Sequence, residues 1–193
     1  MNKKSKSKPR KYTRAILGDI FEVEVEGGYA YGQYINYHKW PPVYGYLVRV
    51  FVGIYKTPIS DVSSLDGQPD QFISFYALSL KDVKLIGSLP IPDELKEFPL
   101  FKSLHLPPCG KHIFRWYINK LSNMKSKDVL ALEWEQKLPD EYMNAPYLGL
   151  INHPMLVTYI ENKWSPLLAP YINDEGKYVD IDEYLANVKP NSE

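Results

Sequence analysis

Hydrophobic and polar residues alternate most regularly near the start of the chain. Phe21, Val23 and Val25 fall on one face of an extended strand, and the glutamates between them fall on the other. The Gly27-Gly28 pair then separates this run from a tyrosine-rich run that continues to about Asn36. Two such runs around a glycine pair predict an antiparallel hairpin whose first strand buries one face only.

The following residues predict three more strands. After the break at Pro41-Pro42, a largely apolar third strand is expected to extend to about Tyr55, followed by a loop rich in proline, serine and glycine. The fourth and fifth strands are predicted over residues 71–80 and 83–87. Five short strands within about 75 residues predict a small, bent antiparallel sheet or a partly open barrel.

The second half of the chain mixes both kinds of element. Residues 112–119 and 128–134 are predicted as strands, with a short helical turn at most at Asp140-Glu141. A helix is predicted after His153-Pro154, because proline suits the first helical turn and apolar residues follow at helical spacing. A second helix is predicted over residues 181–188, capped by Asp180.

The sequence therefore predicts an α+β protein whose residues 15–188 form a single compact domain. Five prolines in the middle of the chain predict an extended connector that wraps the first sheet, since proline fits neither a long helix nor a central strand. The predicted parts are a basic disordered tail (1–14), a β-rich lobe (15–88), a proline-rich connector (89–110), a mixed lobe (111–188) and a short tail (189–193).

Charge is unevenly distributed, although 23 basic and 23 acidic residues make the whole chain neutral. Residues 1–14 hold seven basic residues and no acid, which leaves 16 basic against 23 acidic residues and a charge of −7 on the rest. The tail is interpreted as a solvated arm, with contact to nucleic acid as the alternative. The acidic body suits a basic partner, mainly by steering its approach.

Cysteine usage and hydropathy indicate a cytoplasmic protein. The single cysteine, Cys109, excludes an internal disulfide framework and favours a reducing compartment. No apolar run approaches the roughly 18 residues that a membrane-spanning helix needs, so no membrane partner is predicted. The basic start resembles that of a signal peptide, but the apolar run after it, residues 15–17, is too short to serve as one.

No residue pattern points clearly to catalysis, and neither an enzyme nor a cofactor is predicted. Phosphate-binding glycine loops, the Gly-x-Ser-x-Gly elbow and the His-Glu-x-x-His motif are all missing. His105, Cys109 and His112 have a spacing that zinc could use, but a structural site needs four ligands. A metal-free loop with a buried thiol is the preferred interpretation, ahead of zinc binding or a nucleophilic Cys109.

Aromatic residues are abundant, and a dense group follows the predicted hairpin. Tyrosine and tryptophan favour protein interfaces because they bury much area and keep a polar end. A tyrosine-rich sheet packing on itself explains the group equally well, and sugar binding is a weaker third interpretation. The aromatic residues beside the double proline, Tyr37, His38 and Trp40, do not follow the strand alternation and are expected to be exposed. The candidate partner-binding residues are Tyr37, His38, Trp40, Tyr44 and Tyr46.

Several short motifs in the first half occur together in a fixed order. They are GDIFEV (18–23), YAYG (29–32), FISFYALSL (72–80), KLIGSLP (84–90), DEL (93–95) and PLF (99–101). Their order and spacing resemble the immunity protein 26 family, over about residues 15–102. Gln33-Tyr34 stands where that family often has Arg-Val, and Lys84 where tryptophan is common.

The resemblance implies a bacterial immunity protein of a polymorphic toxin or contact-dependent inhibition system. Such a protein binds the toxin domain of its cognate toxin in the cytoplasm, blocks it and catalyses nothing. An acidic inhibitor would suit a nuclease toxin with a basic cleft. The alternative is a small-barrel nucleic-acid-binding protein or ribonuclease of the toxin–antitoxin kind, although the acidic body makes a nucleic-acid partner the weaker prediction.

Overall fold

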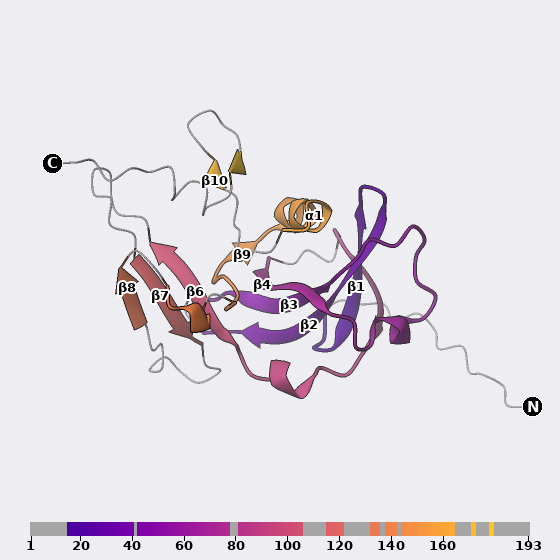
Figure 1. Ribbon diagram of the computed structural model, residues 1–193. Helices are drawn as coiled ribbons and strands as arrows, with labels where there is room; N and C mark the ends of the chain where they lie inside the picture. The colour runs from indigo at the N-terminus through magenta and orange to yellow at the C-terminus, as the bar shows by residue number, and fades with distance from the viewer. Residues whose placement is uncertain are drawn as a thin grey trace, which may run out of the picture.

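A six-stranded sheet, built mostly from the first half of the chain, forms the centre of the fold in the computed structural model (Figure 1). The strand order is β5-β1-β2-β3-β4-β9, and all neighbours are antiparallel except the parallel pair β4 and β9. The sheet is open, so the bent-sheet prediction is confirmed and the barrel alternative is not. Its strands are β1 (Asp19–Val25), β2 (Gly28–His38), β3 (Gly45–Phe51), β4 (Asp70–Tyr76), β5 (Lys84–Ser88) and β9 (Leu150–Ile151).

A smaller antiparallel sheet with the order β6-β7-β8 lies at one end of the large sheet (Figure 1). One α-helix in the described part of the chain, α1 (His153–Glu161), packs over the large sheet. The protein is thus α+β and mostly β, as predicted. The remaining elements are β6 (Leu100–His105), β7 (Arg115–Lys120), β8 (Leu132–Glu135), the strand pair β10 (Tyr171–Ile172) and β11 (Tyr178–Val179), and the 3-10 turns η1 (Val62–Leu65), η2 (Asp93–Leu95) and η3 (Asp140–Tyr142).

The described residues do not include all of the predicted elements. The second predicted helix, over 181–188, and the two tails lie outside them. The structure describes residues 15–40, 42–77, 81–105, 115–121, 132–135, 138–142, 144–164, 171–172 and 178–179.

The helix α1 begins and packs as its sequence predicts. The side chain of Asn152 caps it by accepting a hydrogen bond of 3.0 Å from the backbone N–H of Met155, with Pro154 in the first turn. Leu156, Tyr159 and Ile160 are buried against one face of the large sheet. Burial of three large side chains contributes several kcal/mol of transfer free energy, which a helix this short needs in order to be stable.

The opening motif of the hairpin is explained by backbone geometry and packing. Gly18 adopts a φ of +94°, and the buried carboxylate of Asp19 accepts a hydrogen bond of 2.8 Å from the backbone N–H of Ile16. Phe21 stands opposite Gly32 in the β1–β2 register, and its ring fills the space that a side chain at Gly32 would need. These residues therefore hold the scaffold together.

The first strand is buried on both faces near its start, so the one-sided prediction is wrong there. Ile20 and Glu22 are buried although they lie on the face predicted to be exposed. The segment after β3 folds back over this face, and η1 brings Leu65 against Ile20 and Tyr31. Only Glu24, further along the strand, is exposed as predicted.

The third strand ends earlier than predicted, at Phe51 rather than near Tyr55. Gly53 has a φ of +110°, which turns the chain out of the sheet. Tyr55 then makes an isolated antiparallel bridge with Tyr29, with N–H to O=C distances of 2.8 Å in both directions. This bridge anchors the loop that covers the outer face of the hairpin.

The connector of residues 89–110 is interrupted by the 3-10 turn η2, and its extended part from Leu100 to His105 is the strand β6 of the small sheet. Proline residues precede β6, the last of them Pro99, and Pro107-Pro108 follow it. The strand itself contains no proline. β6 is an edge of the small sheet and pairs with β7 over its whole length. Backbone bonds from Lys102 to Pro146 and Leu148 tie it to the second half of the chain.

A buried polar network crosses the middle of the large sheet. The side-chain amide of Gln33 donates to the carbonyl oxygens of Leu89 (2.8 Å) and Gly18 (3.2 Å). Its oxygen accepts a hydrogen bond of 2.8 Å from Nε of Arg49, whose guanidinium lies over the Phe51 ring. Gln33 thus joins β2, β3 and the chain after β5 inside the protein.

Asp70 at the start of β4 is the acidic end of this network. Its Oδ1 lies 3.6 Å from Nη1 of Arg49, and its side chain is 24% exposed. Burial raises the pKa of this carboxyl from its ordinary value of 3.8 to about 6, although the Arg49 guanidinium lowers it. The negative charge of Glu94 adds to the rise. The folded protein therefore binds a proton in a pH range where the unfolded chain has released it.

This difference predicts a pH dependence of stability. Because the folded pKa is the higher one, the stabilisation is fully present below about pH 4 and is lost as the pH rises through about 6. Relative to Asp70→Asn, the free energy of unfolding of the unchanged protein is expected to fall by on the order of 2 kcal/mol between about pH 4 and pH 7.5. Urea titrations across this range measure it, with the exposed Asp66→Asn as control. Parallel pH curves for Asp70→Asn and the unchanged protein would contradict the assignment.

Candidate protein-interaction surface

An apolar hollow of about 350 Å³ opens where the described chain begins. Ala15, Ile16 and Leu17 form one wall, and Tyr37 and Tyr46 form the other. Ile16 is 54% exposed and Leu17 is 45% exposed, which is unusual for aliphatic side chains next to each other. None of the described side chains that line the hollow is charged. Such a surface can bury apolar groups of another molecule, and it offers little to a charged one.

The two tyrosines are placed by the register of the sheet. Tyr37 on β2 stands directly opposite Tyr46 on β3, and their rings meet edge to face with 4.9 Å between centroids. The hydroxyl of Tyr46 donates a hydrogen bond of 3.1 Å to the carbonyl of Ala15. Tyr34 lies behind Tyr46 with 5.2 Å between ring centroids. Packed aromatic side chains of this kind give a rigid binding surface, because little conformational entropy remains to be lost.

The aliphatic wall is also held in place. The backbone N–H of Ile16 is bonded to the Asp19 carboxylate, and the N–H of Gly18 donates to the carbonyl of Tyr34 at 2.7 Å. Leu89 in turn donates to the carbonyl of Gly18 at 3.0 Å. The Gly-Asp motif therefore fixes the segment that presents the exposed Ile16 and Leu17.

Of the five predicted partner-binding residues, only Tyr37 and Tyr46 line the hollow. Trp40 is half-buried, with the Lys39 ammonium 5.1 Å from its ring centroid. Tyr44 is half-buried and stacks on the ring of Phe75, with 5.0 Å between centroids. Both aromatic side chains therefore bury part of their surface within the protein, away from the hollow.

The predicted exposure of His38 is wrong. The strand β2 extends to this residue, and because side chains alternate along a strand, His38 points to the face opposite Tyr37. It is 4% exposed and lies among the rings of Tyr44, Phe75 and Phe98. Burial lowers its pKa, so the imidazole is held neutral. His38 is a core residue and does not reach a partner at the surface.

The aliphatic wall, residues 15–17, is not among the predicted partner-binding residues, although the sequence contains a signal for it. The apolar run of residues 15–17 is too short for a signal-peptide core, and the sequence pattern places it at the entrance to the predicted hairpin. A short apolar run between a basic tail and a Gly-Asp turn has no strand partner in the pattern. That isolation is the feature that indicates an exposed apolar segment.

Of the three weak candidate zinc ligands, only His105 lies among the described residues. His105 is the last residue of β6, while Cys109 and His112 lie outside the described residues. Within the part of the chain that is described, no three histidine, cysteine or acidic side chains are grouped to hold a metal ion. None of the described helices is long and apolar enough to cross a membrane.

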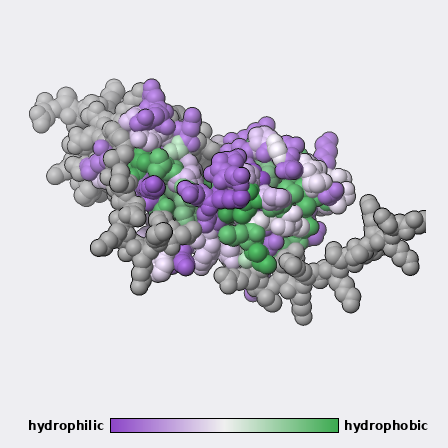
Figure 2. All heavy atoms as spheres, turned by 90° about the horizontal axis from the view of Figure 1, so that it is seen from below, coloured by the Kyte–Doolittle hydropathy of each residue, from purple (hydrophilic) through white to green (hydrophobic). Residues whose placement is uncertain are grey.

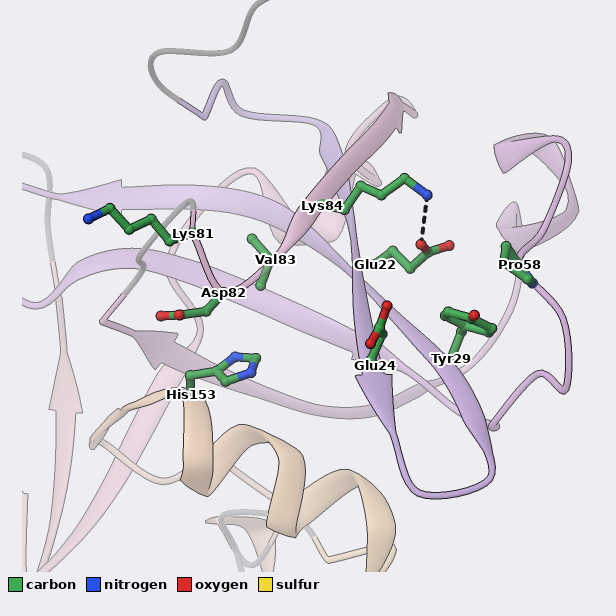
Figure 3. Close-up of a pocket in the computed structure, with 9 residues that line it drawn as sticks. All are labelled: Glu22, Glu24, Tyr29, Pro58, Lys81, Asp82, Val83, Lys84 and His153. Atoms are coloured by element: carbon green, nitrogen blue, oxygen red, sulfur yellow. Dashed lines mark hydrogen bonds and ion pairs between the residues drawn. The ribbon is translucent and has the colours of Figure 1, made fainter.

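A second hollow, of about 440 Å³, has a polar lining (Figure 3). Glu22 is 5% exposed, and its carboxylate accepts a hydrogen bond from the Tyr31 hydroxyl and an ion pair from Lys84, both at 3.0 Å. Burial, reinforced by this carboxylate, raises the pKa of Tyr31 to about 12. The Tyr31 oxygen also accepts the backbone N–H of Ile59 at 2.9 Å. Glu22 therefore braces the covering loop through Tyr31.

Other exposed hydrophobic residues are scattered. Figure 2 shows hydrophobic side chains gathered in two places on the face seen from below, between hydrophilic ones. Val52 and Ile54 lie in the loop after β3, and Leu150 and Met155 lie near the start of α1. None of these side chains lines the hollow at Tyr37 and Tyr46, so they serve as comparison positions for it.

Comparison with known proteins adds no relative to this description. No protein-family model, no curated protein and no solved structure matches the chain. The fold and the surface therefore define an α+β, mostly β protein with an apolar hollow at its surface.

Proposed function

We propose that the protein is an immunity protein, which binds and neutralises the toxin domain of a bacterial polymorphic toxin or contact-dependent inhibition system without catalysis. The observation that carries the proposal is the apolar hollow between the exposed Ile16 and Leu17 and the edge-to-face pair Tyr37 and Tyr46. Exposed aliphatic and aromatic groups on a rigid support favour burial against another protein.

The resemblance of the first half to immunity proteins supplies the kind of partner. The motifs that carry it lie in the scaffold, where Phe21 covers Gly32 and Asp19 fixes the segment before β1. The same segment presents the apolar hollow, so scaffold and surface are physically linked. The partner is expected to offer apolar side chains to the hollow, with basic groups around them that are drawn to the acidic body.

The alternative, a nucleic-acid-binding module, has less support at this surface. A nucleic-acid site needs cations for the phosphates, and aromatic rings alone do not provide them. Among the residues that the structure describes, no lysine or arginine lines the hollow. A protein partner is therefore the function that this geometry favours.

A matched pair of variants tests the proposal. Leu17→Asp, at a position 45% exposed in the hollow, is expected to weaken toxin binding about 100-fold, because a charge would be buried in an apolar contact. Val52→Asp, at a position 46% exposed outside the hollow, is expected to leave binding within about twofold. The measurement is growth rescue and co-purification with the toxin domain encoded by the neighbouring gene.

The two variants also separate loss of binding from loss of folding. Both place an aspartate at an equally exposed aliphatic position, so both should melt within a few degrees of the unchanged protein. Full protection by Leu17→Asp, together with loss of protection by Val52→Asp, would overturn the assignment of the surface. Failure of the unchanged protein to protect against the neighbouring toxin would overturn the proposed function itself.

A further inference from the structure

A buried histidine closes the end of the β2–β3 pairing, next to the apolar hollow. His38 stands opposite Gly45 in the register, and the pair before it is Tyr37 opposite Tyr46, which forms one wall of the hollow. Because side chains alternate along a strand, His38 and Tyr37 point to opposite faces of the sheet. The position of His38 on one face and the tyrosine wall on the other therefore depend on the same short stretch of paired backbone.

The hydrogen bonding of His38 defines its neutral form. One ring nitrogen is bonded to the backbone of Pro42, and because proline has no N–H, the imidazole must donate this bond to the Pro42 carbonyl. The other nitrogen, Nδ1, is buried and has no hydrogen-bond partner among the described residues. The proton is therefore on Nε2, and Nδ1 is the atom to which a second proton would add.

The surroundings of His38 offer nothing that balances a positive charge. The rings packed around it are those of Tyr44, Phe75 and Phe98. Only Tyr44 among them can ionise, and burial raises its pKa, so it is neutral near pH 7. The charged residues of the neighbouring segments, Lys39, Lys96 and Glu97, are exposed, and no ion pair among the described residues involves His38. A proton on Nδ1 would thus be a buried charge without an acceptor, which is costly.

We propose that His38 is an acid-sensitive switch, whose protonation at Nδ1 drives the imidazole out of the aromatic group, opens the end of the β2–β3 pairing and takes apart the tyrosine wall of the hollow. Burial lowers the pKa of His38 from its ordinary value of 6.5. The stabilisation from the buried neutral ring is therefore fully present above about pH 7 and is lost as the pH falls below 6.5.

Release of a partner in acid is a consequence that rests on the proposed function. The opening itself is a property of the protein alone and is measured without any partner. The two parts of the inference therefore have separate tests.

Amide hydrogen exchange on the full chain, followed by NMR, tests the opening. The readout is the opening constant of the pairs between residues 36–38 and 45–47, after correction for the intrinsic pH dependence of exchange. It is expected to rise about tenfold between about pH 7.5 and about pH 5.5, because His38 in the opened state gains a proton with its ordinary pKa. Low concentrations of urea should leave these rates unchanged, since a local opening exposes little surface. Urea-sensitive rates would show global unfolding and overturn the proposal.

Two matched variants assign the effect to His38. His38→Gln keeps a side-chain donor but cannot gain a proton, and it is expected to abolish the tenfold rise. His153→Gln makes the same change at a half-buried histidine that is bonded to the Tyr76 hydroxyl at 3.0 Å, and it is expected to retain the rise. A rise that persists in His38→Gln would overturn the proposal.

The unchanged protein gives an answer even if His38→Gln does not fold. The imidazole signals of His38 are expected to titrate with a midpoint below 6.5, over the pH range in which the opening constant rises. A midpoint at or above 6.5 would show that the aromatic rings stabilise the cation, and it would overturn the proposal.

The consequence for binding is measured with the toxin domain encoded by the neighbouring gene. Its affinity is expected to fall about tenfold between the same two pH values for the unchanged protein, and to change little for His38→Gln. Equal pH dependence in both proteins would overturn the link between the switch and the hollow. Failure of the toxin domain to bind at either pH would count against the proposed function, and the opening would still be decided by hydrogen exchange.

Discussion

Gly28→Ala is expected to lower the free energy of unfolding by about 3 kcal/mol, although the substitution adds only one methyl group. A Cβ at this position would lie 2.1 Å from the carbonyl oxygen of Tyr55, and the backbone has a φ of +150°. The clash is with the backbone, which cannot rotate away as a flexible side chain could. Relief would require breaking the Tyr29–Tyr55 bridge, and the loop over the hairpin would move with it.

The neighbouring glycine provides the control for this prediction. Gly27 has a φ of +86°, but a Cβ there would meet nothing within 4 Å. Gly27→Ala should therefore cost only the backbone strain of about 1 kcal/mol. Urea denaturation of both variants measures the difference. Equal costs for Gly27→Ala and Gly28→Ala would show that the packing of Tyr55 against the hairpin is not tight.

Gln33→Leu is expected to cost about 3 kcal/mol although the side chains are similar in size. Leucine would leave Nε of the buried Arg49 and the carbonyl of Leu89 without the partners that Gln33 provides. A buried cation that loses its acceptor carries a larger penalty than a neutral group. Thermal and urea unfolding measure the loss. It should be accompanied by faster hydrogen exchange at the junction of β2 with the chain after β5.

An exposed glutamine serves as the comparison for Gln33. Gln68 lies in the loop before β4, and Gln68→Leu is expected to change stability by less than about 0.5 kcal/mol. A cost at Gln33 no larger than at Gln68 would mean that water replaces the lost bonds, and that the network is not enclosed as the structure has it.

The strands and the helix α1 could be predicted because each has a local physical signal. Alternation before the Gly27-Gly28 turn predicted the hairpin, and Pro154 with its apolar spacing predicted the helix. The second face of β1 could not be predicted in this way. Glu22 is polar, and only the return of a distant loop, with Ile59 bonded to Tyr31, shows that it is covered.

The candidate surface could be predicted in part. The structure brings Tyr37 and Tyr46 of the predicted aromatic group together across β2 and β3, and their contact with a partner stays a prediction. The prediction that His38 is exposed was wrong, because the sequence pattern did not show that β2 continues for two residues beyond Asn36. The aliphatic wall at Leu17 was missed because its contact with the tyrosines is made across the sheet and leaves no periodic signal in the sequence.

We propose that the toxin domain binds in the hollow between Leu17 and the edge-to-face pair Tyr37 and Tyr46. A photoreactive amino acid placed at Leu17, and separately at Val52, tests it most directly in the purified complex with the neighbouring toxin domain. We expect a strong cross-link to the toxin domain from position 17 and none from position 52. Cross-linking from position 52 but not from position 17 would contradict it, because the toxin would then sit on a different face of the protein.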